Sequence, residues 1–333
     1  MLPAFLKRNW FTLGILVMIA LAFLAPGGSA LNAGSRITNA VTVVLFLLIG
    51  LSLSSETILR DLRAARLHAF VLGFIFLANP LYFFLTTRVF AGAVEPAFLV
   101  GIYALACLPT TISSCIVFTQ TSGGNTAAAV FNSAVSNILG VFLSPLLLSI
   151  LIRQGGRGLP AAQLASILAG IGLRMLLPLA VGQLARIPLR AWASRRSGLL
   201  AAISNLLILL LIYLAAASAG STSGLGAILT RMAPVFLYLA ASAPLIVALA
   251  YGGARIVGLK RADVITAVFT GSQKTMAMGI PLITACLAGR PDVLGIAVLP
   301  IVFYHPWQLL MCAVARGMFL STRLRTRLRT RRA

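Results

Sequence analysis

The stretch VFTGSQKTMAMGIP, residues 268–281, places a lysine in the middle of an apolar segment. An isolated ammonium is costly in the hydrocarbon core of a membrane and in a dry protein core, so Lys274 needs polar partners nearby. Its polar neighbours lie between Gly271 and the sequence Gly279–Ile280–Pro281, and both glycine and proline weaken a helix. We therefore expect a helix that is interrupted inside a membrane, where irregular backbone must line protein or water.

The composition of the whole chain agrees with a membrane setting. Of its 333 residues, 60% are hydrophobic and 10% are charged, and the mean hydropathy is +1.02, whereas soluble domains are about 25% charged. Apolar runs of roughly 17–25 residues, enough to cross a membrane as a helix, recur along the chain. They predict an all-α membrane protein with ten spans, at residues 10–26, 37–53, 67–87, 97–120, 124–152, 160–184, 198–219, 232–252, 263–289 and 291–315.

The net charge of +22 raises the possibility of nucleic-acid binding, but the positions of the charges favour a different interpretation. Most basic residues fall in alternate loops and in the tail after residue 315, so the positive-inside rule places both termini in the cytoplasm of a multi-pass inner-membrane protein. The tail, residues 316–333, is then expected to lie on anionic lipid headgroups. We expect no nucleic-acid partner.

The prolines indicate that the chain consists of two related halves. Pro80 and Pro244 are 164 residues apart, Pro145 and Pro306 are 161 apart, and Pro26 and Pro188 are 162 apart. Each half holds five spans, so the second half enters the membrane in the opposite orientation, as in many secondary transporters. We expect a first inverted repeat over residues 1–155, a second over 156–315, and the basic tail over 316–333.

The corresponding fourth spans of the two halves, spans 4 and 9, are both interrupted. Span 4 carries CLPTTISSC, residues 107–115, in which Pro109 removes a backbone donor and the hydroxyls that follow can satisfy freed backbone groups. Transporter sites form where such broken helices meet near the middle of the bilayer. The residues expected to bind substrate or ion are Thr110, Thr111, Ser113, Ser114, Ser272, Gln273, Lys274 and Thr275, with Asn132, Ser133 and Asn137 on span 5 and His305 on span 10.

Several stretches together resemble the bile acid:sodium symporter superfamily, in the branch similar to sodium/bile acid cotransporter 7. They are GLSLSSETILRDLRAARLHAF (50–70), LPTTISSCIVFTQTSGGNTAAAVFNSAVSNILGVFLSPLLL (108–148), GSQKTMAMGIPL (271–282) and VFYHPWQLL (302–310). The resemblance implies ten spans, with spans 3–5 and 8–10 forming a core and spans 1, 2, 6 and 7 forming a panel. It also implies that spans 4 and 9 cross where they unwind.

The resemblance further implies where sodium ligands would lie. The Ser–Asn pair of sodium-coupled members falls on Ser114 and Cys115, their Gln falls on Gln273, and a fifth-span hydroxyl survives at Ser133. Their acidic ligand falls on Phe269. A hard cation normally requires a carboxylate to offset its desolvation, so we expect sodium coupling of the family kind to be absent, although Ser114, Ser133 and Gln273 remain a candidate sodium set.

Lys274 has four interpretations at this point. It can cap free carbonyls as a structural charge, take the space of a cation, bind an anionic substrate, or exchange a proton. We expect a secondary transporter of a small organic anion that works by alternating access, with Na⁺ or H⁺ as the coupling ion if there is one, and no other cofactor. The alternative is a non-transporting membrane regulator or scaffold with the same fold. Nothing resembles a catalytic nucleophile with its base, so an enzyme is not expected, and the oligomeric state stays open.

Overall fold

The computed structural model describes residues 2–24, 36–52, 64–90, 92, 94–154, 169, 172–222, 225–287 and 291–330. Within these residues the chain is helical and contains no strand. The elements are α1 (Leu2–Leu24), α3 (Arg36–Ser52), α4 (Ala65–Gly73), the π-helical turn η4 (Phe74–Ala78), α5 (Asn79–Thr87), α6 (Pro96–Cys107), α7 (Ser113–Ser122), α8 (Thr126–Gln154), the π-helical turn η5 (Gly172–Leu176), α10 (Leu177–Arg195), α11 (Ser197–Thr222), α12 (Leu225–Ile256), α13 (Arg261–Ser272), α14 (Met276–Cys286) and α15 (Pro291–Thr330).

Many of these helices are apolar enough to cross a membrane. By length and composition, five stretches among the described residues qualify, namely Ala65–Thr87, Thr126–Ile152, Ser197–Ala217, Thr230–Ile256 and Val293–Ser321. Shorter apolar helices lie at Leu13–Ala22, Arg36–Ser52 and Pro96–Cys107. The expectation of an all-α membrane protein is therefore confirmed.

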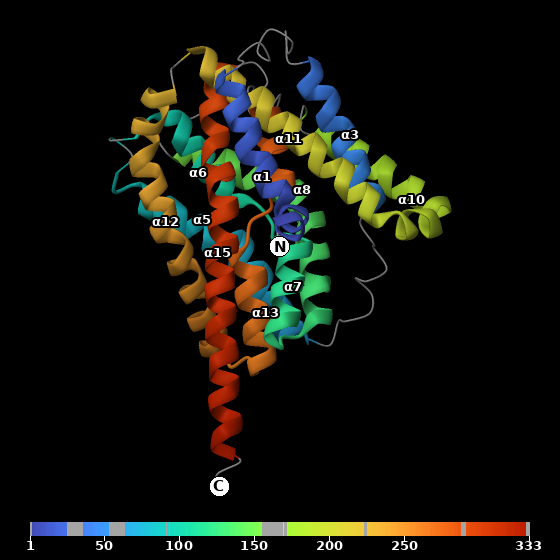
Figure 1. Cartoon of the computed structure of the whole chain (residues 1–333), viewed down its shortest axis with the longest axis vertical. Helices are drawn as coiled ribbons and strands as arrows, with labels where there is room; N and C mark the ends of the chain where they lie inside the picture. Colours follow the sequence, from blue (N-terminus) through green and yellow to red (C-terminus); the bar gives the residue numbers. More distant parts are fainter. Residues whose placement is uncertain are drawn as a thin grey trace.

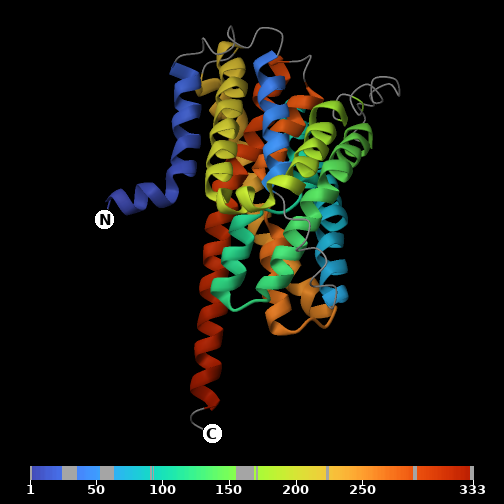
Figure 2. The same ribbon diagram turned by 90° about the vertical axis from the view of Figure 1, so that its right-hand side faces the viewer.

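The long helix α15 runs along the length of the molecule and packs against several other helices (Figure 1). It contacts α6, α11 and α12. A second group of helices, α1, α3 and α11, lies side by side in the upper half of Figure 2, with α10 packed against α3. In the lower half of Figure 1, α7 and α13 lie next to each other.

The last helix is longer than the predicted membrane span. The predicted span ends at residue 315 and a basic tail follows, whereas α15 continues without interruption to Thr330. After Gly317 the segment contains neither glycine nor proline and is rich in arginine and leucine, which are strong helix formers. The expected boundary between the repeats, at residues 155 and 156, lies outside the described residues.

Candidate functional site

Two helix interruptions meet inside the molecule. The helix α6 ends at Cys107 and Leu108 is extended, with φ −69° and ψ 145°, because the residue before a proline is disfavoured in the helical region. The helix α13 ends at Ser272, and Gln273 is also extended, with φ −83° and ψ 150°. The backbone N–H of Thr275 donates to the carbonyl of Pro109 at 2.9 Å. We call this meeting of residues 108–112 with residues 273–275 the crossing.

The side chain of Lys274 is buried at the crossing, with 1% of its surface exposed. Its Nζ donates to the carbonyl oxygens of Ala106 and Leu108, both at 2.9 Å, and to that of Ile75 at 3.4 Å. An ammonium has three protons to donate, so all three are used. Lys274 does not face lipid, as expected, and in this conformation it has no further donor to offer.

The carbonyls that receive these protons come from helix ends and distortions. The last carbonyls of any α-helix lack intrahelical donors, and the end of α6 carries Ala106, Cys107 and Leu108. Lys274 satisfies the first and third, and the hydroxyl of Ser144 donates to Cys107 at 2.7 Å. A cation here also complements the negative end of the helix dipole. An interrupted helix offers both hydroxyls and free carbonyls to an ammonium, and here the carbonyls accept the protons of Lys274.

The peptide group of Lys274 is held by Gln308 on α15. The Lys274 N–H donates to Oε1 of Gln308 at 2.7 Å, and Nε2 of Gln308 donates to the Lys274 carbonyl at 2.8 Å. These two bonds fix the orientation of the amide, so the amide nitrogen also faces Nδ1 of His305, at 3.1 Å. His305 thus reaches the crossing through Gln308 rather than directly.

Hydroxyls from α7 and the residues before it surround Gln273. Oε1 of Gln273 accepts hydrogen bonds from the hydroxyls of Thr111, at 2.7 Å, and Ser114. In contrast, Nε2 of Gln273 and Oγ1 of Thr110 are buried and have no hydrogen-bond partner among the described residues. Because a buried polar group without a partner costs free energy, these two groups are candidate positions for a bound molecule.

The span 5 candidates, on α8, divide between two places. Nδ2 of Asn137 donates to the Thr110 carbonyl at 2.9 Å and to the Ser133 carbonyl at 2.8 Å, so it ties α8 to the crossing. The hydroxyl of Ser133 donates to Val130 in its own helix. Asn132 instead faces α4, where its Oδ1 lies 3.2 Å from Nδ1 of His68.

The remaining candidates contribute little through their side chains. The hydroxyl of Ser272 donates to the Val268 carbonyl within α13, at 2.7 Å. Ser113 is exposed on α7. Thr275 is buried and takes part through its backbone.

Sequence reasoning did not single out two amides, Gln308 and Asn79. Nδ2 of Asn79 donates to the carbonyl of Gly271, at the end of α13, at 3.1 Å, and to that of Phe74 at 3.0 Å. Both amides are polar residues within two positions of a proline inside an apolar span, with Pro80 beside Asn79 and Pro306 two residues before Gln308. That combination is the signal by which they could have been found.

Phe269 of α13 lies in an aromatic cluster. It is fully buried, its ring stacks on Phe118 with centroids 5.6 Å apart, and it meets Phe319 edge-on at 5.8 Å. Of the acidic side chains that the structure describes, Asp263 accepts from Asn125 and Glu95 pairs with Arg231, both at helix ends. The described part of the crossing therefore holds an ammonium and no carboxylate.

Comparison with known proteins places this arrangement in context. The model of the SBF-like CPA transporter family matches residues 9–319. The chain is 35% identical to the uncharacterised protein PA2026 of Pseudomonas aeruginosa, over 96% of this chain and 95% of that one. It is 33% identical to the putative symporter YfeH of Escherichia coli, over 91% and 90%. It is 30% identical to sodium/bile acid cotransporter 7 of Danio rerio, over 94% of each chain.

Proposed function

Because the chain belongs to the SBF-like CPA transporter family, we propose that it is a secondary transporter that moves a small organic anion by alternating access. The family and its named relatives are transporters rather than enzymes. The observation that carries the proposal is the buried ammonium of Lys274 at the crossing of two interrupted helices, where it sets a positive potential. Intramembrane charges of this kind mark transport pathways.

The helix arrangement supports two inverted five-span halves. Pro109 and Gln273 stand at the two interruptions and are 164 residues apart, within the spacing of the paired prolines. We assign α1, α3, α10 and α11 to the panel of spans 1, 2, 6 and 7. These helices are joined by contacts of α1 with α11 and of α3 with α10 and α11. In this proposal α4 to α8 and α12 to α15 form the core, and the two groups move relative to each other.

The anion binds to groups that still have donors. All three protons of Lys274 point to carbonyls, so its positive charge acts on the substrate through space. Within the described part of the crossing, Nε2 of Gln273 and the hydroxyl of Thr110 are buried donors without a nitrogen or oxygen acceptor, and the polar side chains beside them are the thiols of Cys312 and Cys115, which are weak acceptors. We assign these two donors to the substrate, with Thr111 and Ser114 holding the Gln273 amide in place through its Oε1.

Sodium is not required in this proposal. At the position where the resemblance places an acidic ligand, Phe269 packs against two aromatic rings. Ser133, in the candidate sodium set, donates to its own helix. The carbonyls at the end of α6 are already bound to an ammonium, which repels a second cation. The residues thus do not fit a sodium site of the family kind, and the coupling ion, where there is one, is a proton exchanged at Lys274 or His305.

Uptake into liposomes that contain the purified protein tests the proposal. We would screen small organic anions with Na⁺, with K⁺ or choline in its place, and with or without a pH gradient. Saturable uptake that persists without Na⁺ is expected. A saturable, cooperative requirement for Na⁺ would contradict the coupling argument. Uptake no greater than in empty liposomes throughout would favour the non-transporting regulator.

A pair of threonine variants tests the assigned donors. Thr110→Val removes the hydroxyl and keeps the shape, and a hydrogen bond to a charged group contributes about 1.5–3 kcal/mol, so uptake should fall at least roughly tenfold. Thr119→Val is the matched control. The Thr119 hydroxyl is also buried without a hydrogen-bond partner among the described residues, but Thr119 lies on α7, outside the crossing. Equal effects of the two substitutions would contradict the assignment of Thr110.

A further inference from the structure

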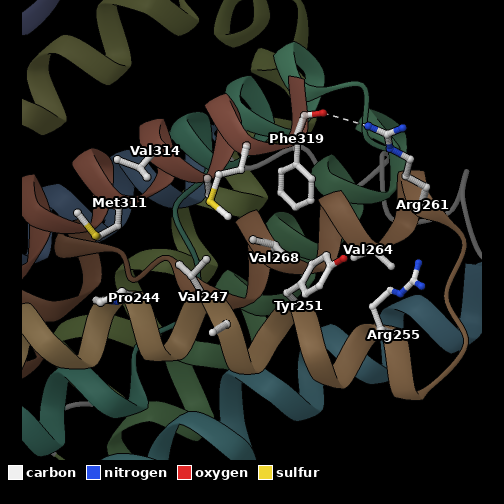
Figure 3. Close-up of a pocket in the computed structure, with 13 residues that line it drawn as sticks. Pro244, Val247, Tyr251, Arg255, Arg261, Val264, Val268, Met311, Val314 and Phe319 are labelled. Atoms are coloured by element: carbon white, nitrogen blue, oxygen red, sulfur yellow. Dashed lines mark hydrogen bonds between the residues drawn. The ribbon is translucent and has the colours of Figure 1, made fainter. Parts of the chain in front are cut away.

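An apolar groove lies away from the crossing, between α12, α13 and α15 (Figure 3). Its volume is about 510 Å³. Its walls include Val247 of α12, Val264 of α13, and Met311 and Met318 of α15. These side chains suit a flexible hydrocarbon, because methionine adapts to irregular apolar partners.

One end of the groove is positively charged. Arg255 in the last turn of α12 and Arg261 at the start of α13 lie at that end, with the ring of Tyr251 beside them, while Pro244 and Met311 lie at the other end (Figure 3). Arg261 donates to the Phe319 carbonyl at 3.0 Å. Among the described residues, neither arginine has a carboxylate partner. Tyrosine and arginine at one end of apolar helices are typical of a membrane boundary.

The length of the groove corresponds to one leaflet of a bilayer. Pro244 and Arg255 lie on the same helix, and at 1.5 Å per residue the distance between them along the axis is about 16 Å. Half of a hydrocarbon core of ~30 Å is ~15 Å. A groove of this length matches the distance from the headgroups to the middle of the membrane.

We infer that this groove binds an anionic phospholipid, with one acyl chain between α12, α13 and α15 and the phosphate at Arg255 and Arg261. Two guanidiniums that pair with no carboxylate among the described residues favour an anionic headgroup, and arginine matches phosphate geometry well. The apolar walls favour a lipid over a free anion. The groove is also connected to the aromatic cluster of α13, because Phe319 lines the groove and its ring contacts Phe269.

Lipid titration of the full-length protein in detergent tests this inference. We would measure the unfolding temperature, and the lipid retained in native mass spectrometry, with phosphatidylglycerol, with phosphatidylcholine of the same acyl chains, and with inorganic phosphate. Phosphatidylglycerol should raise the unfolding temperature saturably and remain bound, and the other two should have little effect. Equal effects of phosphatidylcholine would overturn the role of the arginines. Equal effects of inorganic phosphate would overturn the role of the apolar groove.

Two variants test the headgroup contact and the acyl-chain contact separately. Arg255→Gln should raise the phosphatidylglycerol concentration at half-effect roughly fivefold, the contribution expected of one basic residue near anionic lipid. Ala248→Phe fills the groove from an exposed lining position on α12 and should abolish the stabilisation. The matched controls are Arg195→Gln at the end of α10 and Ala241→Phe at an exposed position of α12 outside the groove. A response to phosphatidylglycerol that Ala248→Phe leaves unchanged would show that the lipid binds elsewhere.

Discussion

The ammonium of Lys274 is solvated by three carbonyl oxygens in place of water. A lysine at the centre of a membrane helix costs about 2.5–3.5 kcal/mol on insertion scales, and hydrogen bonds of a charged donor offset such a cost better than neutral ones. The carbonyls benefit as well, since two of them belong to the open end of α6 and would otherwise have no donor. At the residue scale, therefore, the ammonium of Lys274 needs the carbonyls of the interrupted helix as acceptors, and those carbonyls need the ammonium as their donor.

We predict that Lys274→Met lowers the unfolding temperature by several degrees. Methionine fills a similar space but donates no hydrogen bond, so the carbonyls of Ala106 and Leu108 lose their donor, and each buried group left unpaired costs about 1–3 kcal/mol. Thermal unfolding in detergent would measure the change. Lys260→Met is the control, because Lys260 is exposed at the start of α13.

Chemical rescue sharpens this prediction. Lys274→Ala leaves space next to the same carbonyls, so methylammonium should raise the unfolding temperature of that variant and leave the wild type unaffected. Choline, which is bulkier and lacks N–H donors, should not. An unfolding temperature of Lys274→Met equal to that of the wild type would show that the carbonyls do not depend on the ammonium.

At the scale of helices, α3 and α10 approach each other through two glycines. A Cβ added at Gly182 would clash with the Leu47 carbonyl oxygen, and one added at Gly50 would clash with that of Leu179. Side chains of α10 also reach the end of α3, since Arg186 donates to the Leu51 carbonyl at 2.6 Å and Gln183 donates to that of Gly50. Small residues permit such close approach of helices in membranes.

We predict that Gly182→Ala destabilises the protein although alanine is the better helix former. The new methyl group meets backbone atoms of α3, which cannot rotate away, so the two helices must separate. The unfolding temperature should fall, and detergent-solubilised yield should fall with it. Gly198→Ala on α11 is the control, because nothing lies within 4 Å of the added Cβ. If both variants unfold at the wild-type temperature, the contact is looser than described.

Individual side chains show how far the sequence predicts this site. The polar stretch and Pro109 predict where α6 and α13 end, because proline and helix-breaking patterns act locally. The spacing of four residues also places Ser133 with Asn137, and Asn132 with Ser136, on shared faces of α8. It does not say which neighbour each face meets, and Asn132 meets His68 of α4 while Asn137 meets the crossing. For the same reason the partners of Gln308 and Asn79, which lie on other helices, could not be assigned from sequence.

At the scale of the whole molecule, polar contacts mark the two ends of the helix assembly. At one end Arg231 of α12 pairs with Glu95, the residue before α6, at 3.6 Å. At the other end Asn125, between α7 and α8, donates through its side chain to Asp263 of α13 at 3.1 Å, and through its backbone to Thr266 at 2.9 Å. In the first pair Arg231 is exposed and Glu95 is partly buried, so the pair contributes little to stability, but it shows that the starts of α6 and α12 share one side.

The final prediction concerns which end faces the cytoplasm. The positive-inside rule places Arg255, Lys260 and Arg261 in the cytoplasm, so the opposite end, where α5 gives way to α6, should be external. Val89 and Ile256, each 88% exposed, lie at these two ends. With native cysteines replaced, Val89→Cys should react with an impermeant maleimide in intact cells, whereas Ile256→Cys should react only after permeabilisation. Because both sites are equally exposed, a difference in labelling reports sidedness rather than accessibility. The reverse pattern would invert the topology and place the arginine end of the apolar groove in the outer leaflet.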